Sequence, residues 1–281
     1  MSILVSAIYR GTYSNCGEHP HAVQILHTAA TGGDAYLCGG TLITPKHVLT
    51  AAHCAAKSTR NPTTEATASD LKVSRLQCDE KNRQLLREGG EEFDVVHVHA
   101  QATWLATGSP DHDMAILELA TPMKYHPFLA DPAALPAYEG PVEPSWEQED
   151  RSLIILGAGT VGTSQTSISD WLRQVRVDVL TKQHCDMRAD AAYGVPYSTW
   201  NLLKGNYFCA VDEDTLSGAC GGDSGSGAVE YVDGRKRVVG VAATGPVICS
   251  SPNHFNIYGG VSAWMPWIKT VVGASYALKL I

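Results

Sequence analysis

The sequence predicts an all-β fold built from two halves and followed by a C-terminal helix. Its 281 residues include 26 glycines and 14 prolines, and only 18% are charged, a composition typical of short strands joined by turns. Two sets of strand-like stretches are separated by the proline-rich segment 122–144, which predicts a connection between the halves. A 44% apolar content is enough for a large core in a chain of this length.

The first half contains five stretches that alternate or are apolar in the manner of strands. They are Val23–Thr28, Ala35–Ile43, Leu71–Leu76, Phe93–Val98 and Asp113–Leu119. Between them, the segment Lys57–Asp70 is rich in Thr, Ser and Ala, and the segment Asp79–Glu92 is charged. Both segments predict loops exposed to solvent.

The second half contains six further stretches of the same kind. They are Leu153–Leu156, Leu172–Val179, Tyr207–Ala210, Gly227–Tyr231, Val238–Ala243 and Ile257–Val261. After them, Trp264, Trp267, Ile268 and Val271 recur at helical spacing, which predicts a terminal helix over about residues 263–272 and a short tail over 273–281.

Charge and cysteine content exclude several classes of protein. The net charge of −8 argues against a nucleic-acid or anionic-membrane partner, and no apolar run approaches the roughly 18 residues of a membrane span. Eight cysteines indicate four disulfides and an oxidising compartment. With no C-x-x-C pair or H-E-x-x-H run, we predict no metal site, and we interpret the pairs His97/His99 and His19/His21 as surface residues.

The stretch Gly218–Gly227 carries the strongest chemical signal. Ser224 follows Asp223 within a run of glycines, which let the backbone turn sharply and point N–H groups outward. A nucleophilic serine also needs a base and a group that orients the base. Two upstream segments offer them: Thr-Ala-Ala-His-Cys contains His53, and Asp-Met-Ala-Ile-Leu begins with Asp113.

These three motifs, in the order His, Asp, Ser, resemble those of the chymotrypsin/trypsin-like serine proteases, and the resemblance covers about Ile8 to Val272. It implies two antiparallel Greek-key β-barrels, over about residues 20–121 and 145–262, with the active site at their junction. It also implies a secreted, monomeric endopeptidase with protein or peptide substrates, possible protein inhibitors and no cofactor. Some members bind calcium near the segment Asp79–Glu92, but no ligand set can be matched here, so calcium stays open.

By resemblance, Ser224 is the nucleophile and His53 is the general base, with a pKa suited to proton exchange near neutrality. Asp113 orients His53; we prefer it to Asp111 because an apolar strand begins directly after it. The backbone N–H groups of Gly222 and Ser224 form the oxyanion hole.

The amino-terminal region resembles the processing site of a zymogen. Met1–Ala7 is interpreted as a leader remnant or propeptide, since its last three residues resemble the end of a signal peptide. Ile8-Tyr-Arg-Gly resembles the amino terminus of the mature family members. The resemblance then implies an ion pair between the new amine of Ile8 and Asp223.

The resemblance also implies the pairing of the cysteines. It joins Cys38 to Cys54, Cys185 to Cys209 and Cys220 to Cys249, which leaves Cys16 and Cys78 as the fourth pair.

The primary specificity pocket is predicted to be neutral. By resemblance its lining residues are Gly218, Ala219, Ala243, Thr244, Gly245 and Asn256. None carries the acidic group that trypsin-like members use, so we expect uncharged side chains of moderate to large size, with Leu, Phe, Tyr or Met favoured. The acidic run Asp212–Asp214 is the alternative source of a carboxylate in the pocket.

Two other functions are the alternatives to a protease. A non-catalytic homologue that acts as a binding module is supported by Ala243, which replaces a serine that normally bonds to the aspartate of the triad. An esterase of the α/β-hydrolase type predicts the order Ser, Asp, His and a parallel sheet, and both disagree with this sequence.

Overall fold

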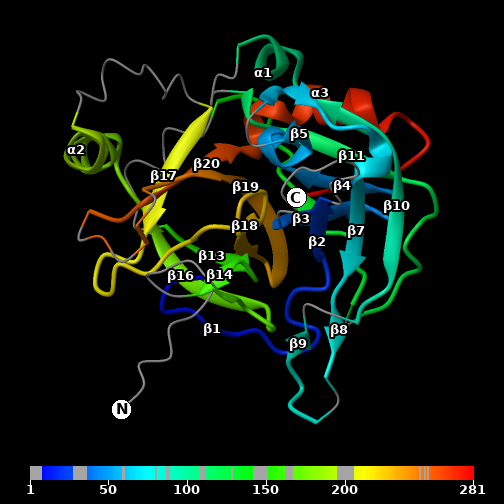
Figure 1. The fold of residues 1–281 in the computed structure, drawn as a ribbon, viewed down its shortest axis with the longest axis horizontal. Coiled ribbons are helices and arrows are strands. Elements are labelled where there is room, and N and C mark those ends of the chain that lie inside the picture. The colour runs from blue at the N-terminus through cyan, green and yellow to red at the C-terminus, as the bar shows by residue number, and fades with distance from the viewer. Residues whose placement is uncertain are drawn as a thin grey trace.

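The computed structural model describes residues 8–27, 37–58, 61–79, 81–86, 89–107, 112–127, 129–141, 151–161, 167–194, 206–246, 248–249, 251 and 253–281. The predicted leader Met1–Ala7 and the alternative aspartate Asp111 lie outside these residues. Two barrels stand side by side (Figure 1).

The first barrel closes in the strand order β10-β11-β4-β3-β2-β7. Its strands are β2 (Ala22–His27), β3 (Leu37–Thr44), β4 (His47–Thr50), β7 (Leu71–Arg75), β10 (Glu92–Ala100) and β11 (Ala115–Leu119). All neighbouring pairs are antiparallel. Ile25, Leu42, Val73 and Ile116 are among its fully buried side chains, as expected for strands that turn their apolar positions inward.

The second barrel runs in the order β18-β13-β16-β17-β20-β19, and pairing of β18 with β19 closes it. Its strands are β13 (Ser152–Gly157), β16 (Arg173–Val179), β17 (Tyr207–Val211), β18 (Gly227–Val232), β19 (Arg235–Thr244) and β20 (Asn256–Gly260). Three short strands extend it: β1 (Thr12–Tyr13) pairs with β16, β12 (Ala134–Leu135) pairs with β19, and β21 (Lys279–Leu280) pairs with β12. The predicted all-β fold with two antiparallel barrels is confirmed.

The terminal helix is also present, as α3 (Val261–Val272). Its buried face consists of Val261, Met265, Ile268 and Val272, spaced as on one side of a helix. Helix α2 (Lys182–Tyr193) was not predicted from the sequence, because it has too few apolar residues to show helical periodicity. Its ends are nevertheless marked, by the cap at Thr181 and by Gly194 in the left-handed conformation.

Two segments expected to be loops contain strands. Lys57–Asp70 includes most of the hairpin β5 (Ala56–Ser58) and β6 (Asn61–Glu65), and the turn η2 (Ala68–Asp70) follows it. The hairpin β8 (Gln77–Cys78) and β9 (Leu85–Leu86) enters Asp79–Glu92. The loop prediction was wrong there because backbone pairing in a short hairpin leaves little trace in side-chain pattern. The remaining short elements are η1 (Ala52–Ala55), α1 (Ala102–Thr107), β14 (Thr160–Val161) and β15 (Ser167–Ile168).

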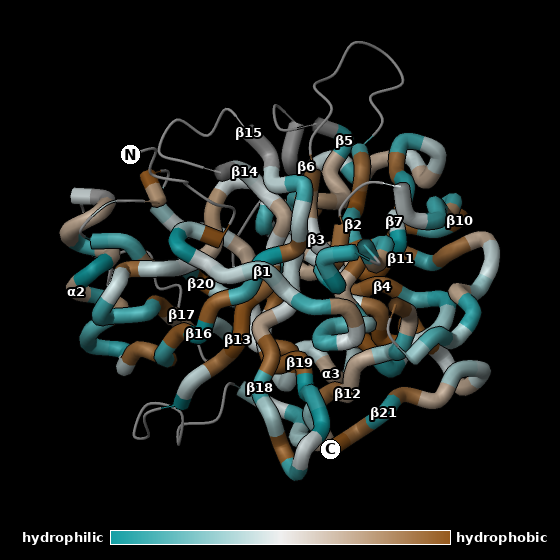
Figure 2. The backbone as a smooth tube through the Cα atoms, turned by 90° about the horizontal axis from the view of Figure 1, so that it is seen from below, coloured by the Kyte–Doolittle hydropathy of each residue, from teal (hydrophilic) through white to brown (hydrophobic). Residues whose placement is uncertain are grey.

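One buried cluster spans the two barrels. It joins Val23 and Leu49 of the first barrel to Val229 and Val241 of the second, and it includes the buried face of α3. Figure 2 shows apolar segments along inner strands of both barrels, for example β4 and β13. The barrels therefore share a core, and the loops at their junction are held by it. Within the described residues, no helix combines the length and apolar character needed to cross a bilayer.

Candidate active site

His53 and Asp113 meet at the edge of the first barrel. His53 lies in η1, just after β4, and Asp113 comes just before β11; since Ala115 pairs with Thr50, the two residues are neighbours. His53 Nδ1 donates to Asp113 Oδ2 over 2.7 Å, and the His53 backbone N–H donates to Asp113 Oδ1 over 2.8 Å. Because an ionised carboxylate can only accept, the proton sits on Nδ1 and leaves Nε2 as the base.

The pKa of His53 reflects two opposed effects. Burial lowers the pKa of His53, whereas the charge of Asp113 and its hydrogen bond raise it. Together the two effects of Asp113 outweigh burial, so the pKa lies above the usual 6.5. The carboxylate of Asp113 is itself buried. The pair is therefore arranged to stabilise a protonated imidazole, which is the form that follows proton uptake from a nucleophile.

Two residues beside this pair were not found from the sequence. Trp104 of α1 is buried, with its ring centroid 6.5 Å from that of His53. The Tyr207 hydroxyl, from β17 of the second barrel, accepts a hydrogen bond from the Asp113 N–H over 3.4 Å. Both come from segments remote in sequence and carry no motif, so no local pattern could have identified them.

The loop that carries Ser224 is docked on the first barrel. The Gly39 N–H donates to the Ser224 carbonyl over 2.7 Å, and Thr50 Oγ1 donates to the Gly39 carbonyl over 2.9 Å. A Cβ on Gly225, which has φ +79°, would lie 2.2 Å from Thr50 Oγ1, so only glycine permits this approach.

Ser224 is therefore held against the strands that lead to His53. No hydrogen bond joins the Ser224 hydroxyl to His53, both of which are described, and His53 Nε2 lies 3.7 Å from Cys54 Sγ. Catalytic hydrogen bonds of free enzymes are often long and tighten only around bound substrate.

Two backbone donors next to Ser224 have no partner. Within the described part of the chain, the N–H groups of Gly222 and Ser224 donate to no acceptor, whereas those of Asp223 and Gly225 are bonded. Gly222 has φ +86°, which turns its peptide sharply. Two unpaired donors at a partly exposed turn suit a developing oxyanion.

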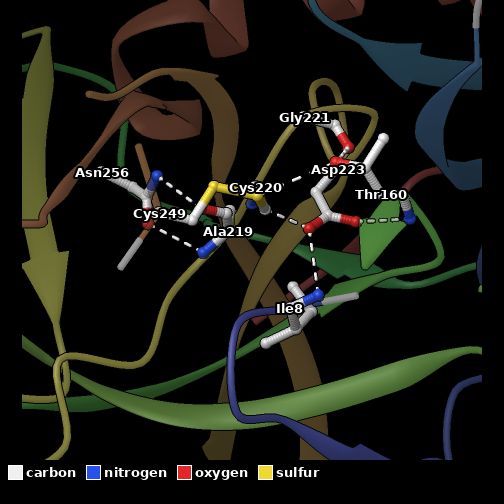
Figure 3. Close-up of a disulfide and its surroundings, with 9 residues drawn as sticks. Ile8, Thr160, Ala219, Cys220, Gly221, Asp223, Cys249 and Asn256 are labelled. Carbon is white, nitrogen blue, oxygen red and sulfur yellow. Dashed lines mark hydrogen bonds between the residues drawn. A yellow bond between two sulfur atoms is a disulfide. The ribbon is translucent and has the colours of Figure 1, made fainter. Parts of the chain in front are cut away.

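Asp223 receives the amino-terminal segment in a buried site (Figure 3). Its Oδ2 accepts from the Ile8 N–H over 3.3 Å and from the Cys220 N–H over 2.9 Å, and its Oδ1 accepts from the Gly159 N–H over 2.8 Å. Ile8 and Asp223 are both fully buried. Burial raises the pKa of Asp223 to about 7, and the three N–H groups offset this only in part.

The segment after Ile8 reaches the predicted pocket. The Tyr9 N–H donates to the Gly218 carbonyl over 2.8 Å, and Arg10 Nη1 donates to the Thr215 carbonyl over 2.8 Å. The position of Ile8 is thus connected to the loop that contains Gly218.

Asn256 binds to Ala219 in the predicted pocket (Figure 3). Its Oδ1 accepts from the Ala219 N–H over 2.8 Å, and its Nδ2 donates to the Ala219 carbonyl over 3.1 Å. A Cβ on Gly245 would lie 2.6 Å from Asn256 Nδ2. Ala243 and Thr244 end β19, where Ala243 is buried and Thr244 is exposed.

Two of the three acidic residues of the run Asp212–Asp214 are engaged elsewhere. Asp212 accepts from the N–H groups of Asp214 and Thr215 in its own turn. Glu213 pairs with Arg188 Nη2 over 3.1 Å.

Disulfides join all eight cysteines in the pairing that the resemblance implies: Cys16–Cys78, Cys38–Cys54, Cys185–Cys209 and Cys220–Cys249. Among the described residues, the group of potential metal ligands is Cys38, His53 and Cys54. Its two sulfurs are bonded to each other and are not available as thiolates.

The prediction that His19 and His21 lie at the surface was wrong. Both are buried, and His19 Nε2 is hydrogen-bonded to Gln174 Oε1 over 2.6 Å, so their alternation reflects packing and not exposure.

Comparisons with known proteins agree with this geometry. A sequence model of the family described as Trypsin matches residues 8–268. The chain is 30% identical over 265 residues to Trypsin Tyr p 3.0101 of Tyrophagus putrescentiae, covering 93% of this chain and 79% of that protein. It is 26% identical to Serine protease Hayan of Drosophila melanogaster, covering 92% and 38%, and 24% identical to CLIP domain-containing serine protease B15 of Anopheles gambiae, covering 96% and 70%.

Proposed function

Because the chain belongs to the trypsin family and is a chymotrypsin-like serine endopeptidase, we propose that it acts outside the cell and cleaves proteins through an acyl-enzyme on Ser224. His53 Nε2 takes the Ser224 proton as Oγ attacks the peptide carbonyl, and then returns it to the departing amine. Water, activated by the same histidine, releases the acyl group and restores the serine.

The observation that carries this proposal is the double contact between His53 and Asp113. Two hydrogen bonds of 2.7 and 2.8 Å hold the imidazole with Nε2 unprotonated. Asp113 stays ionised and stabilises the imidazolium during the reaction. The unpaired N–H groups of Gly222 and Ser224 stabilise the oxyanion of the tetrahedral intermediate. This chemistry uses side chains and backbone alone and calls for no cofactor.

Activation is proposed to follow cleavage after Ala7. The contact between the Ile8 nitrogen and Asp223 supports it, because a free amine there would supply the positive charge that a buried carboxylate lacks. Asp223 neighbours both Ser224 and the donor at Gly222, so this contact orders the oxyanion loop.

An extracellular location is proposed from the cysteines. All eight are in disulfides and none is free, and disulfides persist in oxidising compartments. The partners we expect there are protein or peptide substrates and protein inhibitors.

The decisive experiment labels the processed protein with an organophosphonate probe and identifies the modified residue. We expect a single adduct on Ser224, and we expect Ser224→Ala to lower turnover by on the order of 10⁶-fold while the fold is kept. Ser152→Ala, on β13, is the matched control and should label like the parent. Peptide cleavage by Ser224→Ala near the parental rate would contradict the assignment, and a folded, processed protein that takes no label would favour the binding-module alternative.

A further inference from the structure

The floor of the primary pocket carries a side chain that crosses it. Ala219 precedes the loop of Ser224, and Gly245 follows β19, whose Ala242 carbonyl binds the Gly225 N–H over 2.8 Å. The family resemblance places the primary pocket, which receives the substrate side chain before the cleaved bond, between these two segments. The carboxamide of Asn256 is bonded to Ala219 (Figure 3), and a Cβ built on Gly245 would lie 2.6 Å from its Nδ2.

This carboxamide is fixed in position. Asn256 is only 6% exposed, and it begins β20, where it pairs with Ala210. Its oxygen accepts from one backbone group of Ala219 and its nitrogen donates to the other, so neither rotation nor a flip of the amide keeps both bonds. Displacing it would leave a buried N–H and a buried carbonyl unpaired, which is costly.

His254 lies behind the same floor. It is fully buried, and neither ring nitrogen has a hydrogen-bond partner of normal geometry among the described residues. A Cβ built on Gly218 would lie 2.6 Å from His254 Nε2 and 2.5 Å from Asn256 Oδ1. The ring and the carboxamide therefore occupy the space that a side chain at position 218 would need.

The surroundings of this floor disfavour a cation. Burial lowers the pKa of His254 to about 4, and the neighbouring charge of Arg188 lowers it as well, so the ring is neutral at pH 7. Arg188 Nη1 donates to the His254 carbonyl over 3.3 Å, which places a positive charge close behind the ring. Arg188 is itself paired with Glu213, and within the described residues no carboxylate bonds to Asn256 or to the His254 ring, so a substrate lysine or arginine would find no free acidic partner at this floor.

We propose that Asn256, backed by His254, closes the primary pocket to long side chains, so that the enzyme cleaves after small uncharged residues such as Ala, Ser, Thr or Val. This inference rests on the proposed function and narrows it. The sequence alone favoured Leu, Phe, Tyr or Met, because it could not show that the Asn256 amide is fixed to Ala219 by two bonds and lies beside Gly245.

The first test measures kcat/KM of the processed enzyme for peptides that differ only in the residue before the cleaved bond. We expect Ala and Val peptides to exceed Phe, Leu and Arg peptides by about tenfold or more. Equal or better cleavage after Phe, Leu or Arg would overturn the inference.

The second test removes the crossing side chain. Asn256→Gly should raise the ratio of Phe to Ala cleavage by about tenfold or more. Asn253→Gly makes the same change of residue type in the preceding loop and should keep the parental ratio. If Asn256→Gly proves unstable, Asn256→Ser should also raise the ratio of Phe to Ala cleavage, by a smaller factor. An unchanged ratio in the folded variant would overturn the role of Asn256.

A third variant tests the space behind the floor. Gly218→Asp adds the acidic group that trypsin-like members use, but its side chain would collide with His254 and Asn256. We expect no gain for Arg or Lys peptides, and a gain of about tenfold would refute the blocked floor.

Organophosphonate labelling separates the two levels of failure. Labelling of Ser224 together with the wrong preference would reject the pocket inference alone. Absence of labelling in processed, folded protein would reject the proposed function and the inference with it.

Discussion

Both carboxylate oxygens of Asp113 bind the same residue, one to the ring and one to the backbone of His53. Ala243 cannot donate the hydrogen bond that family members obtain from a serine. The backbone N–H of His53 and the rigid attachment of β11 to β4 still hold the carboxylate in place. We therefore expect Asp113 to orient His53 and to stabilise its protonated form even though Ala243 donates no hydrogen bond.

Asp113→Asn should lower kcat by about 10⁴-fold, as found for this substitution in a related triad, because the amide favours the wrong histidine tautomer. The acid limb of the pH–rate profile should also move to lower pH. In the parent, Asp113 raises the pKa of His53 against the effect of burial; without the charge, burial remains and lowers it. The pH dependence of kcat/KM measures this shift.

Asp94→Asn, on the exposed side of β10, is the matched control and should leave the profile unchanged. If the acid limb of the kcat/KM profile has the same midpoint in Asp113→Asn as in the parent, the assignment of that limb to His53 beside Asp113 is wrong.

At the scale of elements, the turn from Ile8 to Gly11 is bound in a strained form. Ile8 has φ +45°, a conformation that β-branched residues rarely adopt. This angle includes the carbonyl carbon of Ala7, so cleavage of the Ala7–Ile8 bond removes the constraint. The same cleavage creates an amine beside Asp223.

The uncleaved protein should lose stability as the pH rises towards neutrality. Folding raises the pKa of Asp223 from 3.8 to about 7, so the protonated carboxyl stabilises the folded state. This stabilisation is complete below pH 3.8 and is lost as the pH rises to about 7. In the processed protein the ammonium of Ile8 favours the carboxylate and lowers its pKa, so the loss should shrink. The free energy of unfolding, measured from about pH 4 to about pH 8 for both forms, tests this.

Asp223→Asn in the uncleaved protein should flatten the same pH dependence, since the titrating group is gone. Parallel curves for uncleaved, processed and Asp223→Asn proteins would show that Asp223 does not carry the effect.

The end of β13 approaches Asp223 so closely that a side chain cannot be accommodated. A Cβ on Gly157 would lie 2.0 Å from Asp223 Oδ1. Gly157→Ala should cost about 1–3 kcal/mol of unfolding free energy through overpacking, and should also reduce activity by moving Asp223.

Gly259→Ala in β20 is the control, because its Cβ would meet at 3.3 Å only the flexible end of Met114. Denaturant unfolding and kcat should therefore change less for it than for Gly157→Ala. The reverse order would refute the steric argument.

At the scale of the whole molecule, the two barrels should unfold together. One buried cluster contains residues of both barrels and of α3, and the Ser224 loop binds the first barrel through Gly39. Separating the barrels would expose this shared core. We expect a single transition in calorimetry, with loss of circular dichroism and of activity at the same denaturant concentration. Two resolved transitions would indicate that each barrel is stable alone.

The eleven strands found from the sequence are those with strong side-chain patterns, such as Leu71–Leu76 and Val238–Ala243. They alternate or are apolar because one face meets the core. Strand β4 (His47–Thr50) was also missed, because four residues are too few to show a pattern. The other missed elements depend on other interactions. α2 is mostly polar and is marked by its caps, and the hairpins β5–β6 and β8–β9 depend on backbone pairing.

The sequence by itself determined the family, the two-barrel architecture and the candidate triad, because each motif concentrates its chemistry in a few adjacent residues. Only the tertiary structure decided what fills the space between those motifs. Trp104 and Tyr207 reach His53 and Asp113 from distant segments, and Asn256 bonds to Ala219 and lies close enough to Gly245 to leave no room for a Cβ there. The physical reason is that the size of the space between the motifs, and the side chains that fill it, depend on distances of a few ångströms between segments far apart in the chain. No local pattern encodes such distances.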